Sequence, residues 1–176
     1  MGHPLEKFCF CPVCGSQRWA ENNFKSKKCG DCGFVYYANP CSATAAFIVD
    51  EQGRLLVVRR AKEPAKGTLD LPGGFVDNGE TAEEAMAREV CEETGLSVES
   101  CEYLFSIPNV YTYSAMHIHT LDMFFRCRVR RGGTARAADD AEDCQWMRCE
   151  DICPDDFGLR SIREGVIRFL SHVAER

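Results

Sequence analysis

The sequence has no long apolar run, no excess of basic residues and no internal repeat. None of the hydrophobic stretches in its 176 residues approaches the roughly 20 residues that a membrane-spanning helix needs. The first residues, MGHPLEKFCFC, do not resemble a secretory signal, because no basic segment is followed by an apolar one. We therefore expect a cytoplasmic protein without a membrane partner.

The charge is unevenly distributed along the chain, whose formal net charge is −6. Residues 1–38 hold five Lys or Arg and three acidic residues, so this segment carries +2 and the remainder −8. Such an acidic body argues against a general duplex-DNA binder. It fits a domain that collects divalent cations, although solvated surface acids would give the same total.

Twelve cysteines are many for this length. Without a secretory signal, they indicate metal ligands or buried thiols rather than disulfides. Two Cys-x-x-Cys pairs, Cys11 with Cys14 and Cys29 with Cys32, each precede a glycine, and two such knuckles can hold Zn²⁺ tetrahedrally. A redox pair is the competing interpretation. Cys9 competes with Cys11 as first ligand, and we favour Cys11 because the two knuckles then match.

These knuckles predict a small zinc ribbon over residues 1–38, followed by a second domain over residues 39–176. A segment this short buries little core, so the metal would be structural and would supply folding energy. Three nearby lysines (Lys25, Lys27, Lys28) are of the type that contacts phosphates, although a charge run is more often a solvated face. The cysteines beyond the knuckles are expected to act as small buried or half-exposed hydrophobic residues.

The second domain mixes strand and helix patterns. Residues 41–50 and 54–60 are apolar, β-branched runs joined by a short turn, which predicts a hairpin of two buried strands. Residues 101–107, 121–129 and 144–147 predict further strands, and the second of these alternates apolar and polar residues. The tail from about Arg160 predicts a helix with one apolar face: Ile162, Val166, Phe169, Leu170 and Val173. Together these patterns predict an α/β layered domain.

One predicted helix lies between Thr81 and Gly95. Thr81 and Glu84 form a capping-box pattern at its start, and Gly95 suits a left-handed end. A helical wheel places Ala85 and Met86 on a stripe that faces the core. The same stripe continues to Glu89 and Glu93 at the end of the helix, and Glu92 lies nearby, so we expect these carboxylates to point inward or into a cleft.

Carboxylates aimed inward need a partner, because burying them unpaired is costly. Hard divalent cations such as Mg²⁺ or Mn²⁺ take oxygen ligands and would remove that cost. A solvated acidic helix end is the alternative. The preceding Gly73 and Gly74 favour the metal site, because glycines let the backbone approach closely. Arg88 can hold a carboxylate in one orientation, and Glu80 is a possible partner for it.

This stretch resembles the Nudix box, in which a glycine, glutamates, an arginine and aliphatic residues recur at fixed spacing. Nine specified positions over 23 residues are all filled here: Gly74, Glu80, Arg88, Glu89, Val90, Glu92, Glu93, Gly95 and Leu96. The flanking segments LLVVRR and LDLPGGFVDNGE extend the likeness over most of residues 41–150. The four-cysteine segment is similar to that of the NADH pyrophosphatase branch and its zinc-ribbon relatives.

The resemblance implies a Nudix-like α/β/α sandwich with a mixed sheet and a Nudix pyrophosphatase activity. Such an enzyme uses Mg²⁺ or Mn²⁺ to hydrolyse the diphosphate of a nucleoside diphosphate derivative and releases a nucleoside monophosphate. The match assigns metal binding to three carboxylates and one backbone carbonyl, those of Glu89, Glu92, Glu93 and Gly74. Arg88 and Glu80 would orient these ligands.

Further site residues are expected around the box. The general base of many relatives comes from a loop before a Trp-containing strand, where we favour Glu142 and then Asp140, although a solvated loop is the alternative. Arg59 and Arg60 end a strand and are candidates for phosphate contact. Aromatic and imidazole side chains are candidates for further substrate contact, although core or ordinary hydrogen-bonding roles compete: Tyr111, Tyr113, His117 and His119.

The substrate is expected to be a small nucleotide such as ADP-ribose, NADH, FAD or a dinucleoside polyphosphate. The chain lacks the Ser-Gln-Pro-Trp-Pro-Phe-Pro stretch that follows the box in NADH pyrophosphatases, which argues against NADH as the substrate. It argues equally against NAD-capped RNA, the one nucleic acid that the resemblance would allow as a partner. A homodimer is consistent with the resemblance. The alternative function is a non-catalytic module that binds a nucleotide or RNA through the same cleft and the ribbon; the intact glutamate cluster favours the enzyme.

Overall fold

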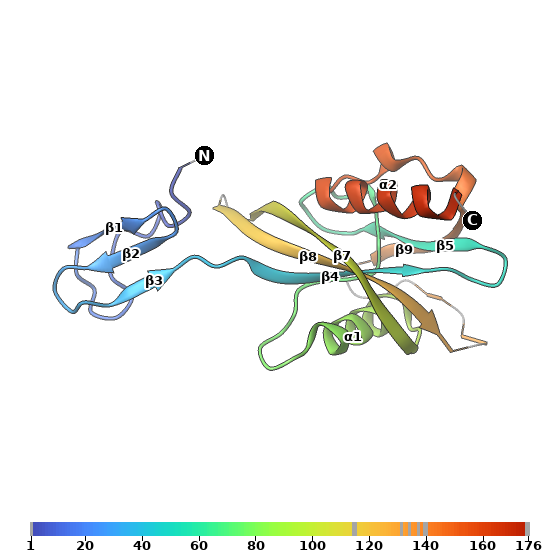
Figure 1. Ribbon diagram of the computed structural model, residues 1–176, viewed down its shortest axis with the longest axis horizontal. Helices are drawn as coiled ribbons and strands as arrows, with labels where there is room; N and C mark the ends of the chain where they lie inside the picture. The colour runs from blue at the N-terminus through green and yellow to red at the C-terminus, as the bar shows by residue number, and fades with distance from the viewer. Residues whose placement is uncertain are drawn as a thin grey trace. The chain divides into compact units, whose positions relative to one another are not determined.

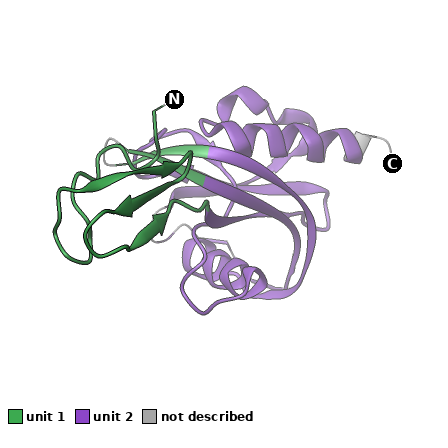
Figure 2. Ribbon diagram, turned by 60° about the vertical axis from the view of Figure 1, so that its left-hand side comes forward, with its two compact units in different colours: residues 1–40, 110–119 green, residues 41–109, 120–176 purple. Residues whose placement is uncertain are grey.

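The computed structural model (Figure 1) describes residues 2–113, 116–130, 132–133, 135–136, 138 and 141–174. For residues 173 and 174 only the backbone is described. The chain divides into two compact units, which are coloured separately in Figure 2. Unit 1 comprises Met1–Pro40 and Val110–His119, and unit 2 comprises Cys41–Asn109 and Thr120–Arg176. The predicted domain boundary between residues 38 and 39 stays a prediction.

Unit 1 contains a three-stranded antiparallel sheet of β1 (Trp19–Asn23), β2 (Ser26–Cys29) and β3 (Val35–Tyr37) in that order. Its apolar core is small and consists of Cys11, Trp19 and Cys29, with Phe34 packed against them. The rings of Trp19 and Phe34 stack with centroids 6.1 Å apart. Two of these core residues are predicted zinc ligands, so the metal site and the core of the unit coincide.

Unit 2 contains the predicted mixture of strands and helices. Its elements are β4 (Cys41–Ile48), β5 (Arg54–Arg60), β6 (Leu69–Asp70), α1 (Ala82–Thr94), β7 (Val98–Tyr113), β8 (Met116–Val129), β9 (Ala141–Arg148), the 3₁₀ helices η1 (Cys149–Asp151) and η2 (Pro154–Asp156), and α2 (Arg160–Ala174). The tips of β7 and β8 belong to unit 1. In the described part of the chain, no helix is both long and apolar enough to cross a membrane.

Two three-stranded sheets form the centre of unit 2, in the orders β4-β8-β7 and β6-β5-β9. β4 runs parallel to β8, whereas β5 is antiparallel to both of its neighbours. One hydrophobic core joins α2 to Phe47 and Phe124, and a second core joins α1 to Ile48 and Phe125. α1 and α2 therefore cover opposite sides of the strands (Figure 1), and the predicted α/β/α sandwich with a mixed sheet is confirmed.

The predicted hairpin of residues 41–50 and 54–60 is wrong, because β4 and β5 belong to different sheets and share only the isolated bridge Val49↔Leu55. One edge of β4 pairs with β8. The other edge binds residues 72–76, where the Ala46 N–H donates to the Pro72 carbonyl. No edge of β4 is left for β5, which pairs with β9 instead.

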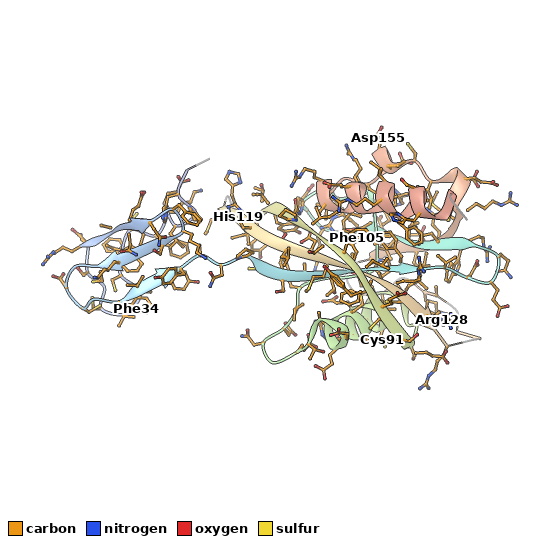
Figure 3. All side chains as sticks on the ribbon, viewed as in Figure 1. Phe34, Cys91, Phe105, His119, Arg128 and Asp155 are labelled. Atoms are coloured by element: carbon orange, nitrogen blue, oxygen red, sulfur yellow. The ribbon has the colours of Figure 1, made fainter. Side chains whose placement is uncertain are left out.

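The other predicted elements are present, and several are longer than expected. β7, β8 and β9 extend the predicted strands at 101–107, 121–129 and 144–147. β8 is buried on both faces, with Phe124 in one core and Phe125 in the other, so its alternation does not separate core from solvent. α2 buries its predicted apolar face, except that the side chain of Val173 lies outside the described residues. Phe105 of β7 lies toward α2 (Figure 3) and stacks under the Arg168 guanidinium.

Candidate active site and metal centre

Local sequence fixes both ends of α1. The Thr81 hydroxyl accepts the Glu84 N–H, and the Glu84 carboxylate accepts the Thr81 N–H, which completes the predicted capping box. Gly95 ends the helix in the left-handed conformation at a φ of 70°. Between these caps the buried face begins with alanine and methionine and ends with Glu93. The helix therefore buries the carboxylate of Glu93, one of those that the wheel placed on this stripe.

Arg88 connects the other carboxylates of the box. Its Nε and Nη2 donate to the two oxygens of Glu80 at 2.8 and 3.0 Å, a two-point contact that fixes both side chains. Its Nη1 donates to Glu89 at 2.8 Å and to Glu92 at 3.0 Å. Nη2 also donates to the Phe75 carbonyl at 3.1 Å, which ties the helix to the glycine turn. A single guanidinium thus positions three carboxylates.

The charges at Arg88 stabilise one another. Hydrogen bonding from Arg88 holds the pKa of Glu80 below its ordinary value, and hydrogen bonding to Glu80 and Glu89 raises the pKa of Arg88. The carboxylates differ in exposure, because the Glu89 side chain is 15% exposed and the Glu92 side chain 47%. Glu92, which the helical wheel placed beside the stripe rather than on it, lies toward solvent at the edge of the cluster.

The glycine turn lies directly against the cluster. The Gly73 N–H donates to the buried Glu93 carboxylate at 3.0 Å. A Cβ on Gly74 would lie 2.4 Å from Glu89 Oε1, so only glycine leaves room for this carboxylate. The Gly74 carbonyl accepts the Thr44 N–H at 2.8 Å and the Thr44 hydroxyl at 3.4 Å, so Thr44 orients this carbonyl. Thr44 is a site residue that sequence reasoning missed, because only the pairing of β4 with the turn reveals it.

The donor set fits a hard divalent cation. Glu80, Glu89, Glu92 and Glu93 carry −4 and Arg88 carries +1, so the cluster has a formal charge of −3. All side-chain donors are oxygens, which Mg²⁺ and Mn²⁺ prefer. In this structure Arg88 bridges Glu89 and Glu92, and the described glutamates do not converge as closely as the cysteines of unit 1 do. Metal binding by these glutamates stays a prediction.

Glu142, the favoured general base, lies at the start of β9 rather than in the expected loop. The register of β9 against β5 shifts here, since Arg59 pairs with Asp143 and Arg60 with Ala141. Glu142 is the extra residue of this β-bulge, a feature that often re-aims a side chain near active sites. Its side chain is exposed. Asp140, the second candidate, lies outside the described residues.

The segment before β9 is anchored to the end of α1. The Ala138 N–H donates to the Glu93 carbonyl at 3.0 Å, and the Arg136 N–H donates to the Thr94 carbonyl at 2.9 Å. These contacts satisfy carbonyls that a helix end leaves unpaired. Glu142 is four positions after Ala138, so its backbone lies within about 14 Å of that of Ala138. The role of Glu142 as general base stays a prediction.

The two candidate phosphate-binding arginines have different surroundings. Arg59 is partly exposed and donates to the Gly67 carbonyl at 2.6 Å. Arg60 forms an ion pair with Asp70 and donates to the Pro64 carbonyl. Burial raises the pKa of Asp70, and the charge of Arg60 lowers it in part. Arg60 is therefore engaged in a structural pair. Sequence reasoning missed Asp70, whose only signal is an acid inside the apolar LDLP segment.

The remaining predicted substrate contacts belong to unit 1. Tyr111, Tyr113, His117 and His119 lie at the tips of β7 and β8, whereas the box lies in unit 2. Tyr113 is exposed and Tyr111 is partly buried. The roles of these four side chains in substrate binding stay predictions.

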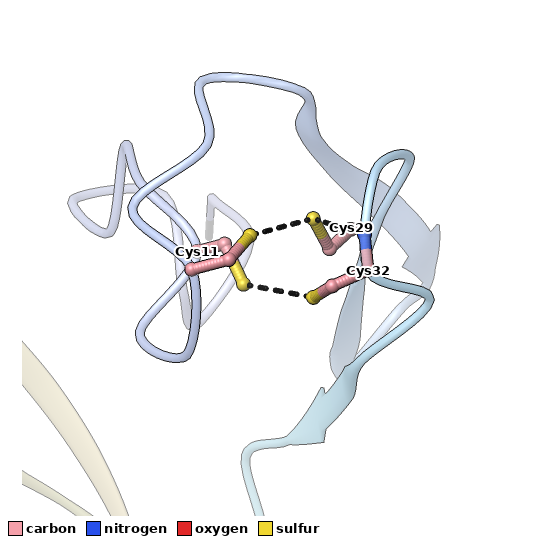
Figure 4. A group of neighbouring side chains, drawn as sticks. Cys11, Cys29 and Cys32 are labelled. Atoms are coloured by element: carbon pink, nitrogen blue, oxygen red, sulfur yellow. Dashed lines mark hydrogen bonds between the residues drawn. The ribbon is translucent and has the colours of Figure 1, made fainter.

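The two Cys-x-x-Cys knuckles of unit 1 face each other, as Figure 4 shows for Cys11, Cys29 and Cys32. All four sulfurs of these knuckles lie within 4.8 Å of one another. The Sγ atoms of Cys11 and Cys32 are 3.7 Å apart, and those of Cys14 and Cys29 are 3.6 Å apart. A Zn–S bond of about 2.3 Å gives a tetrahedron with edges of about 3.8 Å. The sulfur positions therefore fit Zn²⁺.

The backbone of the second knuckle favours a thiolate at Cys29. The N–H groups of Cys32 and Asp31 point at Cys29 Sγ and, with the Cys32 amide as the larger cause, lower the pKa of Cys29 to about 6. Cys9 is not part of the cluster and donates to the Lys7 carbonyl instead. Lys27 is buried, and its ammonium donates to the Phe8 carbonyl, so it does not offer a surface charge to phosphates.

A capped helix that ends in a carboxylate cluster beside a glycine turn, within an α/β/α sandwich, is the arrangement that the Nudix resemblance implies for this class of domain. The sequence model of the NUDIX domain matches residues 39–169, and the chain belongs to the Nudix hydrolase family.

Similar proteins include enzymes with two named activities. An NAD-capped RNA hydrolase NudC from Vibrio parahaemolyticus is 30% identical over 155 residues, which cover 87% of this chain and 56% of the relative. An ADP-ribose pyrophosphatase from Methanocaldococcus jannaschii is 37% identical over 118 residues, which cover 66% of each chain. The chain spans only about half the length of the NudC relatives, between 51% and 56% for the four from Vibrio.

The fold is shared with solved structures. A NUDIX hydrolase from Nitrosomonas europaea superposes with a TM-score of 0.70 at 23% identity and covers 92% of this chain and 90% of its own. At this identity the likeness establishes the fold alone.

Proposed function

We propose that the chain hydrolyses a phosphoanhydride bond in a nucleoside diphosphate derivative and releases a nucleoside monophosphate. The observation that carries this proposal is the contact between the glycine turn and the helix carboxylates, Gly73 with Glu93 and Gly74 with Glu89. This contact places a concentrated negative charge where a cation and a diphosphate can meet. ADP-ribose, NADH, FAD and dinucleoside polyphosphates belong to this class, and the named relatives act on ADP-ribose or NAD-capped RNA.

The residues of the cluster take distinct roles. Glu89, Glu92, Glu93 and the Gly74 carbonyl hold Mg²⁺ or Mn²⁺, which when bound supplies charge neutralisation for the diphosphate and activation of water. Arg88 and Glu80 keep the ligands oriented through their two-point contact. Glu89 and Glu93 are the principal ligands of this set, because their side chains lie deeper than that of Glu92.

Proton transfer is assigned to Glu142. Its carboxylate accepts the proton of the attacking water as the water oxygen bonds to phosphorus and the bond from phosphorus to the bridging oxygen breaks. Its place in a bulge beside the α1 anchor supports this role. Arg59, at the end of β5, contacts a phosphate of the substrate. Arg60 keeps its ion pair with Asp70 and adds positive charge beside Arg59.

The remaining assignments concern the whole protein. Residues 1–38 form a ribbon around structural Zn²⁺, and residues 39–176 form the hydrolase domain. Small nucleotides are the substrates, and the absence of the NADH-specific stretch favours ADP-ribose or a dinucleotide other than NADH. A cytoplasmic location and a homodimer are consistent with this function.

A panel of ADP-ribose, NADH, FAD and a diadenosine polyphosphate, each with Mg²⁺ or Mn²⁺, tests the proposal. The expected result is nucleoside monophosphate release that falls by about 10³-fold in Glu93→Gln, equivalent to about 4 kcal/mol of transition-state stabilisation. Glu83→Gln is the matched control, since Glu83 is exposed on the first turn of α1. Tight nucleotide binding without turnover in either metal would identify the binding module instead.

A further inference from the structure

Polar side chains interrupt the hydrophobic core between β8 and α2. On the face of β8 that carries Phe124, the next two positions toward the start of the strand are Asp122 and Thr120. Residues two apart on a strand project from the same face, so these three side chains form one row. Asp122 is 7% exposed and Thr120 is 3% exposed, and the carboxylate cluster of α1 uses neither. Buried polar groups need partners, so their place in this core requires an explanation.

The Asp122 carboxylate has protein partners on one of its two oxygens. Oδ2 accepts a hydrogen bond from the Asn109 amide of β7 at 3.2 Å and another from the Ser161 hydroxyl of α2. Oδ1 has no hydrogen-bond partner among the described residues and is not closed off from solvent. Two donors fill the capacity of Oδ2. Oδ1 is therefore the oxygen that a ligand can reach.

Thr120 supplies a second unused group. Its hydroxyl is buried and finds no hydrogen-bond partner in the described part of the chain. The register of β4 against β8 places Cys41 opposite Thr120 and Ala43 opposite Asp122. Both β4 residues are small, and both reach solvent, since Cys41 is exposed and Ala43 is partly exposed. The two unused groups therefore lie beside small side chains, past which a ligand can approach.

This polar row lies close to the glycine turn. Phe75 of the turn forms an antiparallel bridge with Ala43 of β4, and Ala43 is the register partner of Asp122 on the neighbouring β8 (Figure 1). Neighbouring strands are about 4.8 Å apart, so the backbone of Asp122 lies about 10 Å from that of Phe75. A nucleoside can span this distance from a phosphate held at the turn.

The buried charges around the row favour a ligand that donates hydrogen bonds. Burial raises the pKa of Asp70, the charge of Arg60 lowers it in part, and the charge of Asp122 raises it, so the two carboxylates are neighbours. Two carboxylates and one guanidinium give these buried groups a formal charge of −1. Arg160, which donates to the Pro108 carbonyl, is exposed, so solvent screens its charge. A phosphate would therefore be repelled from the row.

The two unused groups require different partners. Asp122 Oδ1 can only accept a hydrogen bond, whereas the Thr120 hydroxyl has one hydrogen to donate. Adenine presents the matching pair on one edge, because its amino group N6 donates and the adjacent ring nitrogen N1 accepts. Hypoxanthine presents the reverse pair, since its O6 accepts and its N1–H donates. The row therefore matches adenine and opposes hypoxanthine.

We propose that Asp122 and Thr120 determine the base specificity of this protein by binding the amino edge of adenine. Asp122 Oδ1 accepts an N6–H, and the Thr120 hydroxyl donates to N1. Asn109 and Ser161 hold the carboxylate in place. Hypoxanthine would place O6 against the carboxylate and leave two acceptors facing each other. The inference deepens the proposed function and rests on it, because a nucleotide substrate brings the base to this position.

Calorimetric binding of AMP and IMP to the zinc-loaded full chain with Mg²⁺ tests the proposal. Neither nucleotide has a phosphoanhydride bond, so affinity is measured without hydrolysis. The unmodified chain is expected to bind AMP at least about tenfold more tightly than IMP. Thr120→Val removes the unpaired hydroxyl at nearly constant shape, so we expect AMP binding to weaken about tenfold and the melting temperature to stay or rise. Ser100→Ala, which removes an exposed hydroxyl of β7, is the control and should change neither.

Asp122→Asn tests the direction of the hydrogen bond. The amide oxygen can take the donors of Asn109 and Ser161, and the amide N–H then faces the base. The preference is therefore expected to reverse from AMP to IMP. In turnover, the KM values of ADP-ribose and its hypoxanthine counterpart should reverse in the same way. Glu102→Gln, at an exposed carboxylate of β7, is the control and should keep the preference for adenine.

The outcomes separate this inference from the proposed function. A preference for AMP that Thr120→Val abolishes supports the adenine site, even if ADP-ribose is not hydrolysed. Equal binding of AMP and IMP, no saturable binding of either, or an unchanged preference in Thr120→Val overturns the site, even if hydrolysis is observed. If Thr120→Val lowers the melting temperature, the reversal expected in Asp122→Asn decides: its presence supports the site, and its absence overturns it.

Discussion

Arg88 is the single side chain on which the arrangement of the box carboxylates depends. It contacts Glu80 through two nitrogens and reaches Glu89 and Glu92 through a third. A planar guanidinium can make these contacts at once, whereas an ammonium is a compact point charge without a fixed fork. Its geometry, and not only its charge, should therefore determine how the metal ligands are held.

Arg88→Lys tests this requirement. The variant keeps the charge and loses the fork, so we expect kcat/KM to fall by about 10- to 100-fold, as for other residues that orient metal ligands. The apparent affinity for Mg²⁺ or Mn²⁺ should weaken with it, measured as the metal concentration that gives half-maximal rate. Arg148→Lys is the control, because Arg148 is 70% exposed and its ion pair among the described residues is with Glu150. Full activity in Arg88→Lys would show that charge alone suffices.

The pair of Asp70 and Arg60 is a second residue-scale feature, with side chains 9% and 17% exposed. Removing one partner leaves the other charge buried, so Asp70→Asn is expected to lower the free energy of unfolding by about 3 kcal/mol. Replacing both partners, as Asp70→Leu with Arg60→Met, should cost less than the single change. Urea unfolding of the variants measures both. Asp155→Asn, at an exposed ion pair with Arg163, should change stability by less than about 1 kcal/mol.

At the scale of elements, the glycine turn lies between β6 and α1 in the chain and hydrogen-bonds to both β4 and α1. Its two glycines have different roles. A Cβ on Gly73 would lie 2.1 Å from the Thr44 carbonyl oxygen, which is backbone and cannot move aside, and its φ of 154° already disfavours a side chain. A Cβ on Gly74 would instead meet the end of the Glu89 side chain. Gly73 is therefore needed for the backbone of the turn to pack against β4, whereas Gly74 is needed for the position of the Glu89 carboxylate.

Alanine at each position should separate these two roles. Gly74→Ala is expected to keep its melting temperature and to lose about 100-fold in kcat/KM, since small displacements of catalytic groups are costly. Gly73→Ala is expected to lose about 2 kcal/mol or more of unfolding free energy, because backbone must shift. Thermal unfolding and steady-state kinetics of both variants distinguish the outcomes. Equal loss of stability in both would contradict the separation.

The elements also show what could be predicted from the sequence. α1 was predictable to the residue, because Thr81, Glu84 and Gly95 act through contacts within one turn. The partner of β4 was not, because it depends on competition for strand edges between residues 72–76, β5 and β8. Box spacing predicted the carboxylate cluster, but a helical wheel could not distinguish the buried Glu93 from the exposed Glu92.

At the scale of the whole molecule, the two units rest on different sources of stability. Unit 2 has two hydrophobic cores that include large side chains such as Phe47, Phe124 and Phe125. Unit 1 has a core of three buried residues, two of which are cysteines of the cluster. So small a core cannot offset the conformational entropy of ordering the segment, so metal binding should supply most of its folding free energy.

Metal analysis of protein purified without chelator is therefore expected to find about one Zn²⁺ per chain, the stoichiometry of a single four-cysteine site. Removing the metal, or introducing Cys32→Ser, should unfold unit 1 and leave unit 2 folded, because the second unit has its own cores. Amide NMR spectra measure both units in one sample, since signals from residues 11–37 should collapse while those of α1 stay dispersed. Cys9→Ser is the matched control, because Cys9 lies outside the cluster. A dispersed ribbon spectrum without bound metal would show that the small core suffices and that the cysteines serve another purpose.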